Sequence, residues 1–124
     1  MIGHHYTDHD IVTLNYEDLR SNITNHANGA LGLWYAKNGA KGHEWASGFG
    51  KNRFLVNIPC LREKGFSLTV EKLATMISKS ADYHEGFRSA LLALGHTHID
   101  IVESNGESHM GVLLDFDNVE VTKA

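Results

Sequence analysis

The sequence contains only one cysteine and one proline in 124 residues. The single cysteine, Cys60, excludes an intrachain disulfide, which suits a reducing compartment, and we expect it to be a small buried apolar residue. No basic segment followed by an apolar stretch opens the chain, and no apolar run reaches the roughly 18 residues that a membrane span needs. These absences favour a cytoplasmic protein with no membrane partner.

An excess of basic charge is also lacking. The formal net charge is -4 at pH 7, and the densest basic run, formed by Arg62, Glu63 and Lys64, has an acid in its middle. Nucleic-acid-binding domains usually carry a clustered basic face. We therefore do not expect a nucleic-acid partner.

Several familiar catalytic patterns are missing. The sequence has no HExxH motif, no paired CxxC, no Gly-x-Ser-x-Gly elbow and no complete glycine-rich phosphate loop. It has nine histidines, and His96 and His98 could share one face of a strand. A zinc site needs three or four ligands, and no such set is visible in the spacing, so we expect no metal.

The elements that are present indicate one α+β domain over residues 1–124. Apolar patterns and turn residues predict strands over 2–6, 31–36, 53–58, 98–102, 110–114 and 119–121. Helical spacing and capping residues predict helices over 16–23, 69–79 and 80–94, and the glycine-rich segment 42–50 is a loop or a short helix. Strands do not alternate regularly with helices, so we expect a mostly antiparallel sheet.

The aromatic residues of segment 29–50 are the most informative feature. Trp34 and Tyr35 lie on the strand predicted over 31–36, and Trp45 follows in the glycine-rich segment. Two such rings could enclose a flat aromatic ligand, and stacking contributes about 0.5–1.5 kcal/mol beyond the buried area. The alternative interpretation is that these aromatics belong to the hydrophobic core.

Four pieces of the sequence, in order, resemble motifs of the His-Tyr-Glu class of ADP-ribosyltransferases. This class includes poly(ADP-ribose) polymerases, some bacterial toxins and short phage-encoded relatives. The pieces are HYT at 5–7, GLWYAKN at 32–38, HIDIV at 98–102 and MGVLLDFDNV at 110–119. Together they span nearly the whole chain.

The resemblance implies a split, mostly antiparallel sheet with flanking helices and a cleft that binds NAD or an ADP-ribose-type nucleotide. It implies that His5 hydrogen-bonds the adenine-side ribose and that Thr7 supports the first-strand turn. It places Trp34 at the position of the family tyrosine, which packs on the nicotinamide side. The residues implied to bind the nucleotide are His5, Thr7, Gly32, Trp34, Tyr35 and Trp45.

The sequence departs from the family at the catalytic glutamate. Alignment on Asp115 places Met110 at that position, His109 precedes it, and Glu107 is the nearest carboxylate. The transfer passes through a positively charged ribose, which a carboxylate stabilises and a methionine does not. Glu107 and His109 are therefore the catalytic candidates, provided that the hairpin register brings them to the cleft.

Three hypotheses follow. The chain is an ADP-ribosyltransferase that modifies a host protein, or a non-catalytic relative that binds a nucleotide or a protein, or an unrelated α+β domain with core aromatics. Under the first two it would be a phage effector or anti-defence protein acting in the host cytoplasm.

Overall fold

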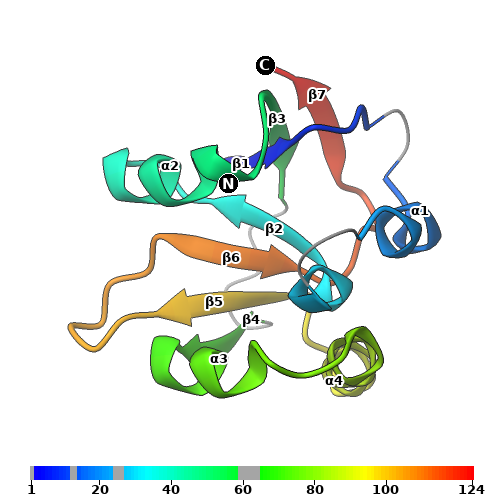
Figure 1. Cartoon of the computed structure of the whole chain (residues 1–124), viewed down its shortest axis with the longest axis vertical. Helices are drawn as coiled ribbons and strands as arrows, with labels where there is room; N and C mark the ends of the chain where they lie inside the picture. The colour runs from blue at the N-terminus through cyan, green and yellow to red at the C-terminus, as the bar shows by residue number, and fades with distance from the viewer. Residues whose placement is uncertain (1, 12–13, 24–26, 59–64) are drawn as a thin grey trace.

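The computed structural model describes residues 2–11, 14–23, 27–58 and 65–124, so Cys60 lies outside the described residues (Figure 1). The strands are β1 (Ile2–Thr7), β2 (Leu33–Ala36), β3 (Asn52–Asn57), β4 (Gly65–Thr69), β5 (His98–Val102), β6 (Met110–Leu113) and β7 (Glu120–Lys123). The helices are α1 (Tyr16–Ser21), α2 (Ala40–Ala46), α3 (Val70–Met76) and α4 (Ala81–Ala93), with 3-10 turns η1 (Ala27–Leu31) and η2 (Ser47–Phe49). No described helix combines the length and hydropathy needed to cross a bilayer.

The described strands form one seven-stranded sheet in the order β4-β5-β6-β2-β1-β3-β7. The β4–β5 pair is parallel, and the other described pairs are antiparallel. The α+β class and the mostly antiparallel pairing are therefore confirmed. Strand β4 was not predicted, because Leu68 is its one fully buried side chain and the strand has no regular apolar alternation.

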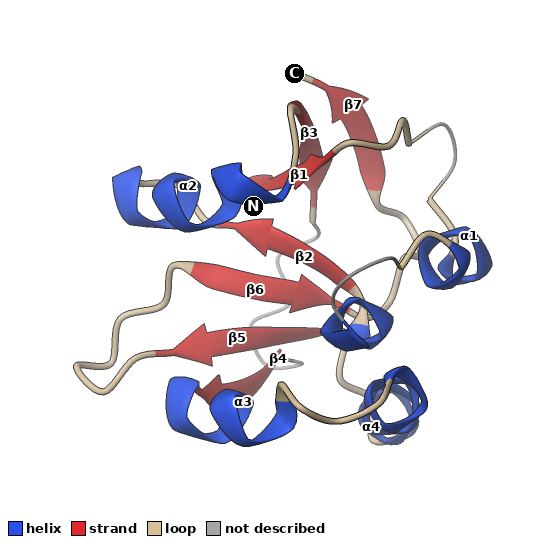
Figure 2. Ribbon diagram, in the orientation of Figure 1, coloured by secondary structure: helices blue, strands red, loops and turns tan. Residues whose placement is uncertain are grey.

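Strands β1 and β2 share little backbone pairing. His4 and Ala36 are the register pair that joins these strands, whereas β1 pairs with β3 from Ile2 to Thr7. Figure 2 shows β3 and β7 running across the direction of β2, β5 and β6. The sheet is therefore continuous in its pairing but bent between β1 and β2, whereas the resemblance implies a split sheet.

Each face of the sheet carries its own apolar cluster, because successive side chains of a strand point to opposite faces. On β2, Ala36 and the partly buried Trp34 belong to the cluster on one face, which we call the cleft-side core because the cavity described below opens there. Leu33 and Tyr35 belong to the cluster on the other face, the far-side core. The cleft-side core also contains residues of α2, α3 and α4, namely Ala46, Leu73, Met76 and Leu91. These three helices thus cover one face of the sheet.

Side-chain caps mark the starts of α1, α3 and α4; the sequence predicts those at Asn15 and Ser80. The side chains of Asn15, Thr69 and Ser80 accept hydrogen bonds from the backbone N–H groups three residues later. Gly95, with a φ of 89°, follows α4, and the Gly95 and His96 N–H groups donate to carbonyls of its last turn.

The boundaries around the aromatic segment differ from the prediction. Leu31 belongs to η1, and β2 begins only at Leu33. Gly32, with a φ of 159°, lies where an added Cβ would be 2.3 Å from the Leu113 carbonyl oxygen. The backbone at Gly32 therefore lies directly against β6, and this contact marks the boundary between η1 and β2. The glycine-rich segment is helical as α2 and η2.

Candidate functional site

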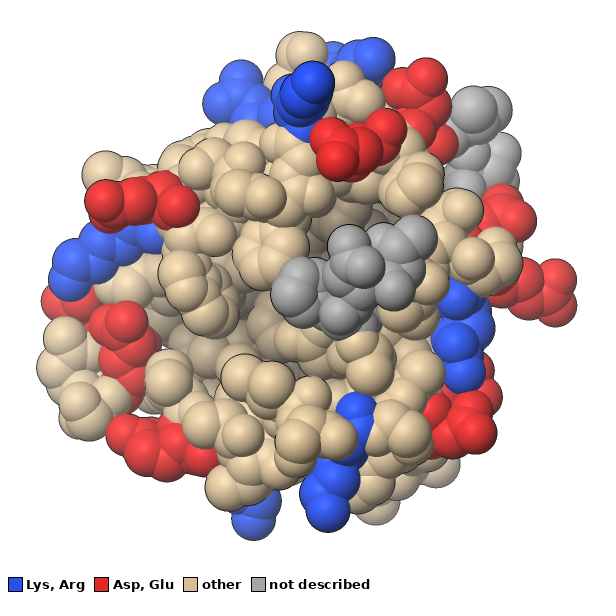
Figure 3. All heavy atoms as spheres, in the orientation of Figure 1, with Lys and Arg blue, Asp and Glu red and all other residues tan. Residues whose placement is uncertain are grey.

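A cavity of about 600 Å³ opens on the helix-covered face, between α2 and η2 on one side and α3 on the other. We call it the central cleft. Its described lining residues are His4, His5, Tyr6, Ala27, Asn28, Gly29, Trp34, Trp45, Ala46, Phe49, Val70, Leu73, Ala74, Ile77 and Met110. Figure 3 shows this face: its described surface has a hollow without Lys, Arg, Asp or Glu, and the charged side chains lie at its margin.

The floor of the cleft comes from the sheet. Trp34 of β2 and Met110 of β6 line it from adjacent antiparallel strands. The Trp34 indole N–H donates to the Asn28 carbonyl of η1 at 3.0 Å. This hydrogen bond satisfies the polar edge of the ring and holds the indole in one orientation beside the cavity.

The walls of the cleft carry large apolar side chains that are exposed to solvent. Trp45 and Phe49 are 55% and 54% exposed, and Val70 and Ile77 on α3 are 40% and 61% exposed. Exposed apolar side chains gathered around a cavity are typical of ligand-binding or protein-binding sites. Trp45 is therefore not a core residue, unlike the alternative considered from the sequence.

His5 provides a partly buried polar group beside the cleft. Its Nδ1 lies 2.6 Å from the Trp34 carbonyl oxygen. A carbonyl only accepts, so Nδ1 carries the proton and Nε2 is left as an acceptor. Burial lowers the pKa of His5 below 6.5, against the opposing effect of this hydrogen bond, so the ring is neutral at pH 7.

A second polar group at the cleft was not identified from the sequence. The Tyr6 hydroxyl lies 2.5 Å from His43 Nδ1, and the rings of His4 and His43 are 4.3 Å apart. Burial, and then His4 and Arg53, lower the pKa of His43. The group joins β1 to α2, and only the tertiary fold brings these segments together.

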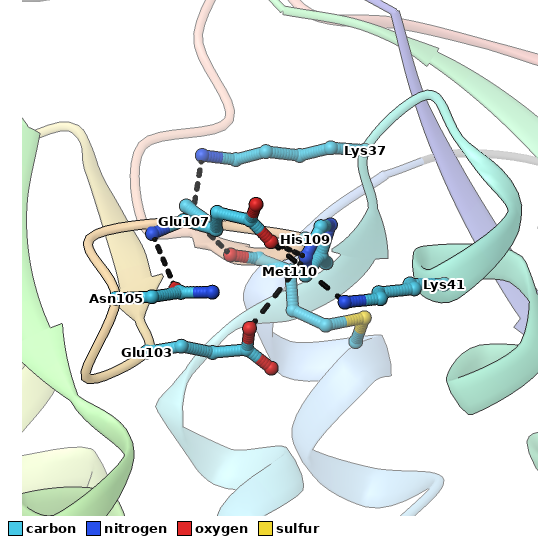
Figure 4. A network of polar contacts seen from close by, with 8 residues as sticks. Lys37, Lys41, Glu103, Asn105, Glu107, His109 and Met110 are labelled. Carbon is cyan, nitrogen blue, oxygen red and sulfur yellow. Dashed lines mark hydrogen bonds and ion pairs between the residues drawn. The ribbon is translucent and has the colours of Figure 1, made fainter.

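Glu107 and His109 lie outside the central cleft. They belong to the connection between β5 and β6, next to a hollow of about 490 Å³ that shares Trp45, Val70 and Met110 with the cleft (Figure 4). Glu107 Oε2 is 3.1 Å from His109 Nε2. The His109 hydrogen bond, and then Lys41, lower the pKa of Glu107.

The remaining predicted site residues do not line the cleft. Tyr35 is fully buried in the far-side core, because it follows Trp34 on the strand and points to the other face. Gly32 packs against the β6 backbone, and the Thr7 hydroxyl accepts from the His9 N–H. The structure thus brings His5, Trp34 and Trp45 together and separates the other three.

The charge of the cleft limits its chemistry. Among its described lining residues, none is Asp, Glu, Lys or Arg. The cleft offers flat apolar surfaces with histidine, phenol and amide groups, which suit a planar ligand with a few polar atoms. Its described lining residues include no carboxylate that could stabilise a developing positive charge on a ligand, and no Lys or Arg that could pair with a phosphate.

Among the described residues, one set of side chains could hold a metal. Glu103, Glu107 and His109 each offer a ligand atom, and these atoms lie within 4.8 Å of one another. His96 and His98, the pair considered from the sequence, belong to no such set in the described part of the chain.

Neither a protein-family model nor a curated protein matches the sequence. A solved structure described as the crystal structure of an anti-CRISPR protein is similar, with a TM-score of 0.52. The likeness covers 100% of this chain and 95% of that chain at 18% sequence identity. At this identity, the likeness shows that the two chains share a fold.

Proposed function

We propose that this chain is an ADP-ribosyltransferase-like protein that binds NAD in the central cleft. The observation that carries the proposal is the convergence of His5, Trp34 and Met110. They come from three of the sequence pieces that resemble the family, and they line one cavity. The resemblance required these pieces to meet at one cleft.

The chemistry of the cleft fits the nicotinamide end of NAD. A volume of about 600 Å³ lies within the range of small-molecule sites. Trp34 and Trp45 supply flat rings for the nicotinamide, and the free Nε2 of His5 accepts a hydrogen bond from a ribose hydroxyl. No Lys or Arg is among the described lining residues, so the pyrophosphate lies at the solvent-exposed rim.

Transfer of ADP-ribose is the activity of this proposal. The ribose C1–nicotinamide bond breaks, nicotinamide leaves, and a nucleophile on the target protein bonds to C1 and loses its proton to solvent or to a base. Glu107, on the connection that precedes β6 and outside the described lining of the cleft, is the candidate carboxylate. A movement of the β5–β6 connection would be needed to bring Glu107 to the ribose.

Binding without turnover is the second candidate, and a specific observation favours it. No carboxylate is among the described lining residues of the cleft, and Met110 occupies the position where the resemblance places the glutamate. The protein would then occupy its target, or sequester the nucleotide, without changing either.

The likeness to an anti-CRISPR protein supports an anti-defence role. The two chains share a fold over nearly their whole lengths. We therefore propose a protein of a CRISPR defence system as the target, encountered in the cytoplasm of a bacterial host.

The first test is a titration of NAD into the purified chain, followed by tryptophan fluorescence and thermal unfolding. We expect quenching and a stabilisation of about 2.7 kcal/mol at a hundredfold excess over Kd. Trp45→Ala should weaken binding about tenfold, whereas Tyr83→Ala, which removes an exposed aromatic outside the cleft, should not. Absence of binding at millimolar NAD would contradict the proposal, and so would an NAD affinity of Trp45→Ala equal to that of Tyr83→Ala.

The second test separates transfer from binding. The chain is incubated with NAD labelled in the adenosine moiety and with purified CRISPR effector proteins. Label that moves to a protein in the wild type but not in Glu107→Gln supports transfer through Glu107. Full binding with neither label transfer nor nicotinamide release supports the second candidate.

A further inference from the structure

The connection between β5 and β6 assembles three metal-ligating side chains that neither the sequence analysis nor the proposed function uses as a set. His109 Nε2 lies 3.1 Å from Glu107 Oε2 and 3.6 Å from Glu103 Oε2. Figure 4 shows both carboxylates directed toward the imidazole ring. One imidazole nitrogen and two carboxylate oxygens are thus close together within a seven-residue segment.

These separations match a transition-metal site. Zinc binds imidazole nitrogen and carboxylate oxygen at about 2.0–2.2 Å, so two ligand atoms of a tetrahedral site lie about 3.4 Å apart. The distances of 3.1 and 3.6 Å from His109 Nε2 bracket this value. The ligand atoms of Glu103 and Glu107 lie within 4.8 Å of each other, so side-chain rotation must close this separation for all three atoms to surround one ion.

The backbone of the segment already has a defined shape. The Glu103 N–H donates to the Glu107 carbonyl at 2.8 Å, and the Gly106 N–H donates to the Glu103 carbonyl at 2.9 Å. Asn105 Oδ1 accepts from the Glu107 N–H at 2.9 Å. These bonds close the turn and bring Glu103 opposite Glu107, which reduces the entropy lost when an ion orders the side chains.

The charge of the cluster favours a cation. Two carboxylates face Lys41, whose Nζ is 3.8 Å from Glu107 Oε2. The nearby Lys37 hydrogen-bonds Ser108 Oγ at 2.8 Å, but its charge is paired with Asp100 at 2.6 Å. The Lys41 side chain is 67% exposed and can move into solvent when an ion binds. Glu103 and His109 also line the hollow of about 490 Å³, so a fourth coordination position would face open space.

We propose that Glu103, Glu107 and His109 bind one divalent transition-metal ion, with zinc as the best match to this mixed nitrogen and oxygen set. The fourth position is left for water or for a group of a bound molecule, as in catalytic zinc sites. Magnesium and calcium prefer sites made of oxygen ligands alone and bind here much more weakly. The site rests on the hairpin geometry, and zinc binding needs no NAD, but Glu107 would have to leave the ion to act in ADP-ribosyl transfer.

The test is isothermal titration of the full chain with zinc chloride in a chelator-free buffer at pH 7.5. We expect one ion per chain with a micromolar Kd, and no comparable binding of magnesium. Glu103→Gln and His109→Gln should each weaken this binding at least tenfold. Lys41→Met should strengthen it several-fold, because the competing positive charge is removed.

Matched controls address the other histidines and carboxylates of the chain. His9→Gln and Glu120→Gln change exposed residues outside the cluster and should leave the zinc affinity unchanged. All the altered side chains are at least partly exposed, so thermal unfolding without zinc should match the wild type. Undetectable binding at 100 μM zinc, or equal affinity in wild type and His109→Gln, would overturn the proposal.

Discussion

At the residue scale, Tyr35 shows how strongly position on a strand controls the role of a side chain. Its ring is fully buried, and its hydroxyl has no hydrogen-bond partner among the described residues. Burial, and then Asp100, raise the pKa of the phenol, so it stays protonated. An uncompensated buried hydroxyl costs about 1–3 kcal/mol relative to its solvated state.

We expect Tyr35→Phe to raise the free energy of unfolding by about 1 kcal/mol, because the substitution removes the unpartnered hydroxyl and keeps the ring. Urea denaturation gives this difference from the shift of the midpoint at an unchanged slope. NAD affinity should not change, since Tyr35 faces away from the central cleft. A destabilisation of similar size would show instead that a buried water serves the hydroxyl.

At the scale of the elements, the strands beside β2 leave room for the Tyr35 ring. A Cβ added at Gly111 of β6 would lie 2.3 Å from the Tyr35 hydroxyl, and one added at Gly3 of β1 would lie 2.8 Å from the ring. The ring therefore lies across two glycines on the neighbouring strands. This close packing connects β1, β2 and β6 where the β1–β2 pairing is weakest.

Gly111→Ala should accordingly destabilise the protein by about 1–3 kcal/mol, as overpacking of a core does. Gly48→Ala is the matched control, since a Cβ there has no neighbour within 4 Å and the residue has no positive φ. Its effect should be near zero. Equal stability of the two variants, measured by thermal unfolding, would mean that the Tyr35 ring moves aside at little cost.

At the scale of the whole molecule, buried histidines couple stability to pH. Burial lowers the pKa of His5, His84 and His98 below the ordinary 6.5, although Asp100 acts in the opposite direction on His98. His84 is fully buried, and among the described residues its ring nitrogens make no hydrogen bond of regular geometry. The nearby Met76 backbone opposes the lowering of its pKa. The unfolded chain binds more protons than the folded chain just below pH 6.5.

Stability should therefore be complete above pH 6.5 and fall as the pH drops toward the folded-state pKa values. Each such histidine contributes up to about 1.4 kcal/mol per pH unit in that window. Urea unfolding between pH 7.5 and 5 measures the slope, and His84→Phe should reduce it. Glu107 shifts stability in the same direction at lower pH, because its pKa is lowered from 4.5. A slope that is flat from pH 7.5 to 5 would contradict the burial of these rings.

The sequence by itself determined the α+β class, most element positions and the helix caps. These properties depend on local patterns: Ser80 before an apolar stripe, Gly95 after it, and alternating apolar residues over 98–102. The aromatic segment also indicated a cleft, and Trp34 and Trp45 do line a cavity; ligand binding there stays a prediction.

Only the tertiary structure decided which face each side chain joins and which distant segments meet. Adjacent aromatics on one strand point apart, so Tyr35 is in the far-side core while Trp34 is at the cleft. The Tyr6–His43 contact joins segments 37 residues apart, and the hairpin turn brings Glu103 to His109. Such contacts depend on strand register and chain reversal, which residue spacing alone does not specify.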